Sequence, residues 1–257
     1  MKNLFFKIIN KIIFIINKNK RIIEVSHFDT KLLFFNTNEI TTYRALSFST
    51  KEPETLNWID SFHDKSVFFD IGANVGIYSA YAAKKNNVNV VAFEPSFFNL
   101  EILFKNININ KLNDKVTIVP LALNNINSIE KFNMSDNRQA AALSSFGQSY
   151  DQYGKDLNIK NFYKTIGIKL DSLLDIYKLE LPDYIKIDVD GIEHLILEGS
   201  VKSLQNVKSV LVEITNSFDE QSSRASALLQ KLNFIRKKNI ENIGISNTEN
   251  QIWIKKE

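Results

Sequence analysis

From Val67 onward the chain alternates short apolar runs with longer segments of helical periodicity, and this order constrains the fold more than any other feature. Residues 67–71, 88–93 and 116–120 are predicted to be buried strands. Residues 76–85 and 97–110, which separate them, are predicted to be helices. A strand–helix–strand order of this kind predicts a mostly parallel sheet that is covered by helices on both faces.

The alternation is interrupted once and then resumes. Residues 124–165 are polar, aromatic and rich in Ser and Asn, and we interpret them as an insertion. Regular structure is expected again at 166–170 and 171–177, then as strands at 184–189 and 209–214 and helices at 192–205 and 220–232. No long helix separates the closing strands, 234–237 and 251–255, so we predict that they run antiparallel. The expected fold class is a doubly wound, Rossmann-like α/β domain over residues 66–257, preceded by a helical extension over residues 1–65.

The amino-acid composition narrows the classes of function that the chain can have. A chain of 257 residues, 44% of them hydrophobic, can bury the core of one α/β domain with a short extension. A net charge of +3 argues against a dedicated nucleic-acid binder. There is no cysteine, which excludes disulfides and thiolate chemistry and fits a reducing, cytoplasmic location.

The first 20 residues have a pattern of their own. Polar side chains recur at helical spacing, which predicts an amphipathic helix; they are Asn3, Lys7, Asn10, Lys11, Asn17 and Lys18. Only residues 12–16 form an uninterrupted apolar run, far short of the ~20 residues that span a bilayer. The helix therefore either packs on its own domain or on a second subunit, or rests on the inner face of an anionic membrane.

The turn between the first predicted strand and helix contains Asp70, Gly72, Asn74 and Gly76. A glycine-rich turn at this place lets backbone amides approach a ligand closely, because no Cβ intervenes. Glu94 ends the second predicted strand, where a carboxylate can accept hydrogen bonds from ribose hydroxyls. A turn with a purely structural role remains the alternative.

The same features partly suit a nicotinamide dinucleotide. However, Asn74 and Ile77 occupy the second and third glycine positions of the GxGxxG pattern that such a ligand requires. Asp70, directly before the turn, would also repel a pyrophosphate, whereas it suits the ammonium group of an amino-acid ligand. A ligand that joins adenosine to methionine matches both Asp70 and Glu94.

Three segments of the sequence, taken in order, resemble a known protein family. Residues 69–76 with Glu94 and Pro95, residues 170–173 and residues 185–193 resemble an FkbM-type methyltransferase, over roughly residues 60–215. The resemblance implies a class I methyltransferase fold with an antiparallel last strand, and S-adenosyl-L-methionine as the methyl donor. It further implies that the following residues surround that donor: Asp70, Gly72, Asn74 and Gly76 at the methionine end, Glu94 at the ribose with Pro95 next to it, and residues 120–123, which include Ala122 and Leu123, at the adenine.

Candidate acid–base residues follow the predicted strand at 184–189. They are Asp188, Asp190, Glu193 and His194. A hydroxyl acceptor must lose a proton during methyl transfer, which calls for a general base. Each candidate has a plainer alternative: the spacing of Asp190 and Glu193 also fits a helix cap, and a lone histidine is often incidental.

Two further hypotheses concern a metal and the acceptor. Asp188, Glu213 and Asn216 could supply oxygen ligands to Mg²⁺, or serve as caps and polar supports instead. The segment 136–163, with Arg138, Tyr150, Tyr153 and Tyr163, suits a lid that binds carbohydrate, or an ordinary solvated loop.

We therefore expect a methyltransferase that O-methylates a hydroxyl of a sugar or of a glycan or glycolipid precursor, as in polysaccharide biosynthesis. The alternatives are a polyketide-type small-molecule acceptor and a scaffold that binds S-adenosyl-L-methionine without turnover.

Overall fold

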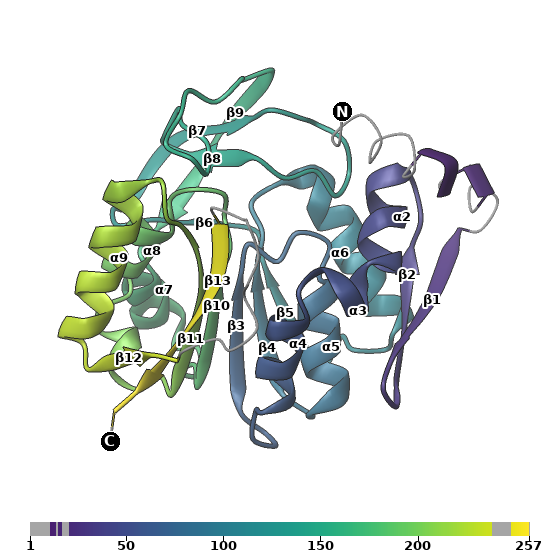
Figure 1. The fold of residues 1–257 in the computed structure, drawn as a ribbon, viewed down its shortest axis with the longest axis horizontal. Helices are drawn as coiled ribbons and strands as arrows, with labels where there is room; N and C mark the ends of the chain where they lie inside the picture. Colours follow the sequence, from purple (N-terminus) through teal and green to yellow (C-terminus); the bar gives the residue numbers. More distant parts are fainter. Residues whose placement is uncertain (1–10, 14, 17–20, 238–247, 257) are drawn as a thin grey trace.

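The computed structural model describes residues 11–13, 15–16, 21–237 and 248–256. Its centre is a seven-stranded sheet in the order β12-β13-β11-β10-β3-β4-β5 (Figure 1). Only β13 runs antiparallel to its neighbours in that sheet as described, which confirms the predicted mostly parallel α/β fold. The strands are β3 (Val67–Ile71), β4 (Asn89–Phe93), β5 (Val116–Val119), β10 (Tyr184–Ile187), β11 (Ser209–Thr215), β12 (Phe234–Arg236) and β13 (Thr248–Lys255).

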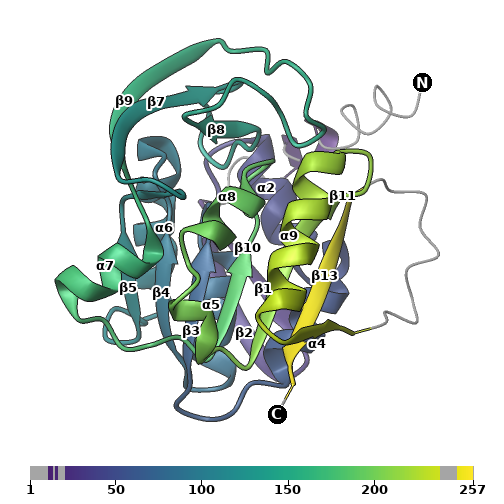
Figure 2. The same ribbon diagram turned by 90° about the vertical axis from the view of Figure 1, so that its left-hand side faces the viewer.

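Alternate side chains of these strands build two separate hydrophobic cores. Phe68 and Val90 point to one face, whereas Phe69 and Val91 point to the other, because successive residues of a strand face opposite ways. Helices on both faces cover the sheet (Figures 1 and 2). The first core includes α5 (Ile77–Lys85) and α6 (Phe97–Ile109); the second includes α7 (Leu170–Tyr177), α8 (Glu193–Glu198) and α9 (Asp219–Lys231).

Most predicted boundaries lie within two residues of these elements, but one predicted helix is divided. The helix expected over 192–205 is two pieces, α8 and a short 3-10 helix at Ser203–Gln205. The break occurs at Gly199, where an added Cβ would lie 2.1 Å from the carbonyl oxygen of Asn124, so only glycine fits there.

The N-terminal extension is richer in structure than its sequence indicates. It contains the hairpin β1 (Ile22–His27) and β2 (Thr30–Phe35), then α2 (Glu39–Leu46), α3 (Phe48–Lys51) and α4 (Pro53–Asp60). Side chains of α6 satisfy the backbone of β2: Phe35 donates to Asn106 at 2.8 Å and Leu33 to Asn110 at 3.0 Å. The extension therefore shares the first hydrophobic core with the sheet.

The predicted insertion forms most of a second sheet. Its strands are β6 (Ala122–Leu123), β7 (Ser128–Met134), β8 (Ser144–Phe146) and β9 (Asn161–Ile168), in the order β6-β9-β7-β8. The strand expected at 166–170 is thus the end of a longer strand that pairs with β7. In Figure 1 strands β7, β8 and β9 lie across the top of the central sheet.

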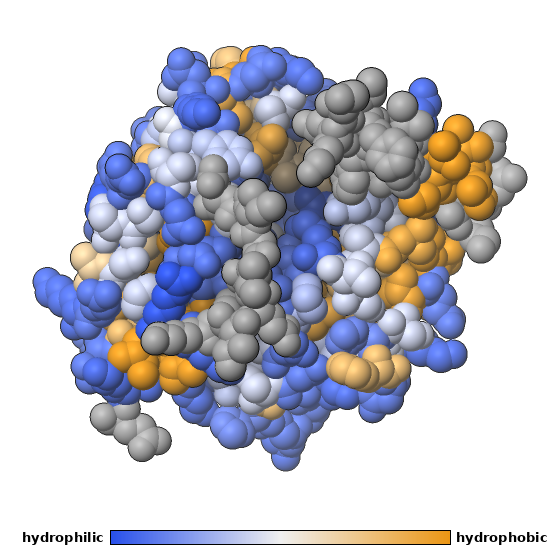
Figure 3. Space-filling model, viewed as in Figure 1, coloured by the Kyte–Doolittle hydropathy of each residue, from blue (hydrophilic) through white to orange (hydrophobic). Residues whose placement is uncertain are grey.

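Most of the predicted amphipathic helix at residues 1–20 lies outside the described residues. Residues 11–13 and 15–16 are helical, and Ile12, Ile15 and Ile16 are exposed. Figure 3 shows apolar surface over this segment and the neighbouring hairpin, where Ile22 is also exposed. Within the ranges that the structure covers, we find no helix with the length and apolar character needed to cross a membrane.

Candidate active site

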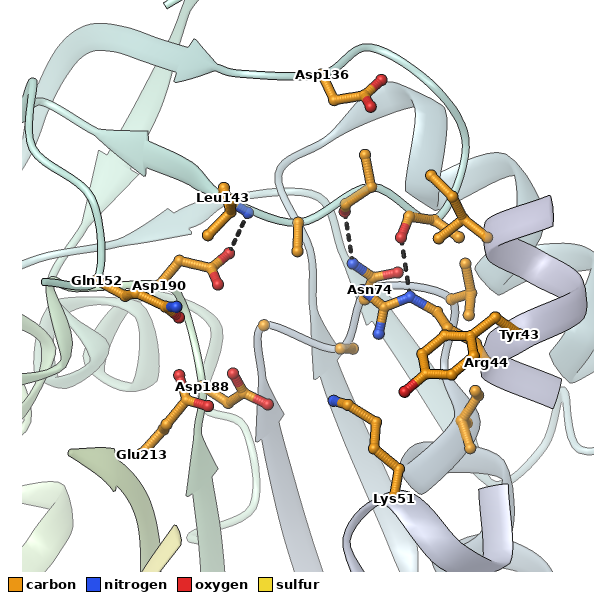
Figure 4. A pocket seen from close by; sticks show the side chains of 18 of the residues that line it. Tyr43, Arg44, Lys51, Asn74, Asp136, Leu143, Gln152, Asp188, Asp190 and Glu213 are labelled. Carbon is orange, nitrogen blue, oxygen red and sulfur yellow. Dashed lines mark hydrogen bonds between the residues drawn. The ribbon is translucent and has the colours of Figure 1, made fainter. Parts of the chain in front are cut away.

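A cavity of about 750 Å³ opens at the carboxyl ends of β3 and β10. In open α/β sheets this is the edge at which ligands bind. Residues 72–75 of the glycine-rich turn line it, together with α2 and α3 on one side and the loop after β10 on the other. Figure 4 shows Arg44 and Lys51 on one wall and Asp188, Asp190 and Glu213 on the opposite wall.

The two glycines of the turn are required by packing. Gly72 has φ +83°, and a Cβ there would lie 1.9 Å from the carbonyl oxygen of Asp188. Gly76 has φ +75°, and a Cβ there would lie 2.2 Å from a methyl group of Leu103. Gly72 therefore lets the turn lie directly against the residues that follow β10, and so brings the predicted donor loop next to the predicted acid–base residues.

Asp70 lies beneath the turn. It is buried, and Oδ2 accepts a hydrogen bond from the Ser79 hydroxyl at 2.5 Å. Burial raises the pKa of Asp70, while Lys186, its register partner on β10, opposes that rise. Oδ1 has no hydrogen-bond partner among the described residues, so a buried acceptor remains available behind the methionine end of the predicted site.

Glu94 and the predicted adenine residues lie on the other side of Gly72. The Glu94 carboxylate accepts hydrogen bonds from the backbone N–H groups of Asn74 and Ser96, both at 2.8 Å. Burial raises the pKa of Glu94 to about 7. A second, small cavity of about 40 Å³ shares Gly72 with the first and is lined by Pro95 and by Ala122 and Leu123 of the predicted adenine stretch. Glu94 lines neither cavity and supports the turn from behind.

Asp188 and Asp190 both line the large cavity, but their environments differ. Burial acts to raise the pKa of Asp188, yet the ion pair with Lys186 at 2.6 Å and the charge of Lys51 outweigh it and leave the pKa below its usual value. Burial, reinforced by Asp188, raises the pKa of Asp190 to about 6. Asp190 is therefore the better matched to a general base near neutral pH.

Glu193 and His194 lie outside both cavities. The fully buried Glu193 carboxylate accepts hydrogen bonds from the N–H groups of Val189 and Gly191 and from the Gln221 amide. His194 is buried against Phe218, and burial lowers its pKa to about 4. The structure thus groups Asp188 with Asp190 and gives Glu193 the supporting role that its spacing also allowed.

The residues of the magnesium hypothesis are only partly brought together. Asp188 and Glu213 share the cavity, and burial, followed by the charges of Asp188 and Asp190, raises the pKa of Glu213 well above its usual value. Asn216 is exposed elsewhere and donates to Glu249 at 3.3 Å. Among the residues described, no three His, Asp or Glu side chains are grouped closely enough to hold a metal ion. The predicted ligand set does not fit a magnesium site.

The segment at residues 139–143, here called the strap, passes over the cavity. Asn74 donates to the carbonyl oxygen of Ala141 and Arg44 Nε to that of Ala140, both at 2.8 Å. At the other end the N–H of Leu143 donates to Asp190 at 2.7 Å (Figure 4). The strap is therefore fixed to the predicted donor turn, the extension and the candidate base at once.

The predicted carbohydrate-binding residues of the insertion are dispersed. Arg138 lines the cavity and forms ion pairs with Glu39 and Asp136. Tyr163 donates to the carbonyl oxygen of Pro95 at 2.5 Å, whereas Tyr150 packs on Phe218 and Tyr153 is exposed. No local motif in the sequence marks the cavity residues of the extension, which were therefore not predicted; they are Tyr43, Arg44, Lys51 and Glu52.

A family model described as the methyltransferase FkbM domain matches residues 70–240, more than half of the chain. The chain belongs to the FkbM methyltransferase family. The hexuronic acid methyltransferase AglP of Haloferax volcanii is 24% identical over 204 residues, which cover 79% of this chain and 77% of that protein. The solved structure of methyltransferase FkbM from Methylobacillus flagellatus KT is similar in fold, with a TM-score of 0.50 and 13% identity over 84% of this chain and 54% of that one.

These findings confirm the predicted family and the predicted methyltransferase fold. As an FkbM methyltransferase the protein uses S-adenosyl-L-methionine as methyl donor. The site fits this donor on its own chemistry: an unpartnered buried acid oxygen of Asp70 and an unpartnered Asn74 Oδ1 lie at the turn, and acidic side chains face the cavity beyond it. These acceptors suit a ligand that carries an ammonium and a sulfonium group.

Proposed function

We propose that this FkbM methyltransferase O-methylates a hydroxyl group of a sugar or of a glycan or glycolipid precursor. One observation carries the proposal: the donor turn at residues 72–75 and the candidate base Asp190 line the same cavity of about 750 Å³. Donor and acceptor held together there would meet beside a carboxylate that can take a proton.

Each residue of the proposed site has its own role in binding or proton transfer. Gly72, Asn74 and Gly76 shape the turn that holds the methionine end of the donor, with Asp70 and Glu94 beneath it. Bound S-adenosyl-L-methionine supplies an activated methyl group. Asp190 accepts the proton of the acceptor hydroxyl. The buried Lys186 keeps Asp188 ionised beside it, so that the wall of the cavity offers a carboxylate where the donor is positive.

The sugar acceptor has two sources of support. The cavity is lined by many polar and charged side chains, such as Asn158, Gln152 and Lys160, which can hydrogen-bond several hydroxyl groups. In addition, the relative from Haloferax volcanii is named for a hexuronic acid, which is an acidic sugar. A polyketide-type hydroxyl lacks the second of these two supports, and we therefore rank it second.

Incubation with donor labelled in its methyl group and a panel of sugars, uronic acids and polyketide-type alcohols tests the proposal. We expect label in a sugar product with the wild type, a loss of about 10²–10⁴-fold with Asp190→Asn, and little change with Asp151→Asn, whose side chain lies outside the cavity. Donor binding without label transfer to any member of the panel would favour the scaffold alternative. Transfer that is unaffected by Asp190→Asn would refute the assigned base.

We also infer that the N-terminal segment rests on an anionic membrane surface. Ile12, Ile15 and Ile16 are exposed close in sequence to the exposed Lys11, an arrangement that suits acyl chains next to acidic headgroups. Deletion of residues 1–20 should release the protein from vesicles that contain phosphatidylglycerol. A full-length protein that ignores such vesicles, and instead dimerises through this segment, would contradict the inference.

A further inference from the structure

One wall of the active-site cavity is formed by residues outside the part of the chain that matches the family model. Arg44 lies in the last turn of α2, and Lys51 ends α3. Both line the cavity, whereas the family match begins at residue 70. The helix that carries Arg44 begins with a capping box, in which the side chains of Asn38 and Thr41 bond each other's backbone.

Arg44 is oriented by its own hydrogen bond. Its Nε donates to the carbonyl oxygen of Ala140 at 2.8 Å, which leaves the two terminal nitrogens at the cavity side (Figure 4). Those nitrogens have no hydrogen-bond partner among the described residues. A guanidinium fixed in this way offers a planar pair of donors, the geometry that a carboxylate accepts best.

Lys51 supplies a second positive charge to the same wall. Its ammonium pairs with Glu52 at 2.5 Å and, in Figure 4, points into the cavity from below Arg44. Burial acts to lower the pKa of Lys51, but Glu52 and Asp188 outweigh it and raise the pKa, so the charge is retained at neutral pH. Glu52 in turn is shared with the buried Lys186, which leaves Lys51 only partly neutralised.

The opposite wall carries the acids Asp188, Asp190 and Glu213. At neutral pH the ionised acids of that wall are Asp188 and Asp190, because the pKa of Glu213 is raised well above its usual value. The cavity therefore has a cationic side and an anionic side. An anionic group of a ligand is repelled by the acids and attracted to the basic wall, and a cationic group is directed the other way. A phosphate, with a larger charge, would be less well matched because the acids lie across the same cavity.

We propose that Arg44 and Lys51 form a carboxylate-binding subsite of this cavity. The proposal rests on the proposed function and deepens it, since the carboxylate belongs either to the methionine part of the donor or to a uronic-acid acceptor. In either case the extension contributes residues that position a reacting ligand, and these residues do not take part in the chemical step.

The test is a calorimetric binding matrix with two pairs of ligands. S-adenosylhomocysteine has a carboxylate and 5′-methylthioadenosine has none; glucuronate has one and glucose has none. The proteins are wild type, Arg44→Gln, Lys51→Gln, and Lys84→Gln as a control that removes an exposed charge outside the cavity. Arg44→Lys keeps the positive charge but removes the planar pair of guanidinium donors. Thermal unfolding shows whether each variant is folded.

We expect Arg44→Gln and Lys51→Gln to weaken at least one carboxylate ligand by about tenfold or more, the scale of a lost charge-assisted hydrogen bond, while its neutral partner and the Lys84→Gln control change little. A loss confined to S-adenosylhomocysteine assigns the donor's carboxylate, and one confined to glucuronate assigns the acceptor's. Equal losses for charged and neutral ligands, or no loss, overturn the subsite.

The same matrix separates this proposal from the proposed function. A wild type that ignores both adenosyl ligands refutes the donor site, while the glucuronate pair still decides the subsite. A wild type that binds neither carboxylate ligand refutes the subsite outright.

Discussion

Replacing Gly72 by alanine tests how the donor turn and the candidate base are held together. Two costs are expected. The φ of +83° is strained for any residue with a Cβ, at about 1–2 kcal/mol. The new Cβ would also lie 1.9 Å from the Asp188 carbonyl oxygen, far inside the ordinary contact range that begins at 3.4 Å. Overpacking of this kind costs about 1–3 kcal/mol, so Gly72→Ala should lose about 2–5 kcal/mol in total.

Gly147→Ala is the matched control. Gly147 has a similar φ of +70°, but its nearest contacts to an added Cβ are 3.7 Å away, so it should lose only the conformational part, about 1–2 kcal/mol. Urea unfolding followed by circular dichroism measures the free energy of unfolding of both variants, and calorimetry measures binding of S-adenosylhomocysteine. Gly72→Ala should also weaken that binding, because the turn and the β10 loop must separate. Equal destabilisation of the two variants, with donor binding intact in both, would refute the reasoning.

Three further outcomes are expected. Above the Glu94 pKa of about 7, Glu94→Gln should weaken binding of S-adenosylhomocysteine by about 1–3 kcal/mol, because a charged acceptor of the Asn74 and Ser96 N–H groups beside the predicted ribose site is lost. An unchanged dissociation constant by calorimetry at such a pH would contradict this role. With its pKa raised to about 6, Asp190 is a base only when ionised, so kcat/KM should rise as pH increases through about 6. That inflection should be absent from the residual activity of Asp190→Asn, and a profile identical to wild type would exclude Asp190 as the base. Burial lowers the pKa of His194 from 6.5 in the unfolded chain to about 4 in the folded protein. As pH decreases from about 6.5 to about 4, the unfolded chain therefore takes up a proton that the folded protein does not, and the free energy of unfolding decreases by up to about 3 kcal/mol. His194→Leu should remove this part of the pH dependence in chemical unfolding, and parallel curves for variant and wild type would count against it.

The parts of the molecule that could be predicted from sequence are those governed by neighbours in the chain. Buried strands such as β3 and β10 are apolar runs, and the turn after β3 carries its glycines in a fixed pattern. Family, fold and methyl donor follow from these local signals. Asp70 and Glu94 were predicted to be donor residues because they lie at the ends of neighbouring strands, and strand ends in a parallel sheet share one edge.

What could not be predicted depends on contacts between distant segments. Arg44 reaches Ala140 across 96 residues, and Asn74 reaches Ala141 across 67, with no local pattern that marks either pair. The second sheet was not predicted because its apolar residues are not all buried. Ile129 on β7 and Ile166 on β9 pair with each other and are both exposed, so the spacing of apolar residues does not show which face of these strands is buried. Asp190 and Glu193 have a spacing that suits a cap or a catalytic pair, and only burial distinguishes the two roles.

The division of the cavity between the matched domain and the N-terminal extension has a consequence for how such enzymes diversify. Arg44 and Lys51 stand on short helices that precede β3, whereas the donor turn and Asp190 belong to the sheet. Substitutions in α2 and α3 can therefore alter the charge that an incoming molecule meets without replacing any residue of the donor turn or the candidate base. Exchanging residues 39–52 between homologues is accordingly a direct route to new ligand preferences.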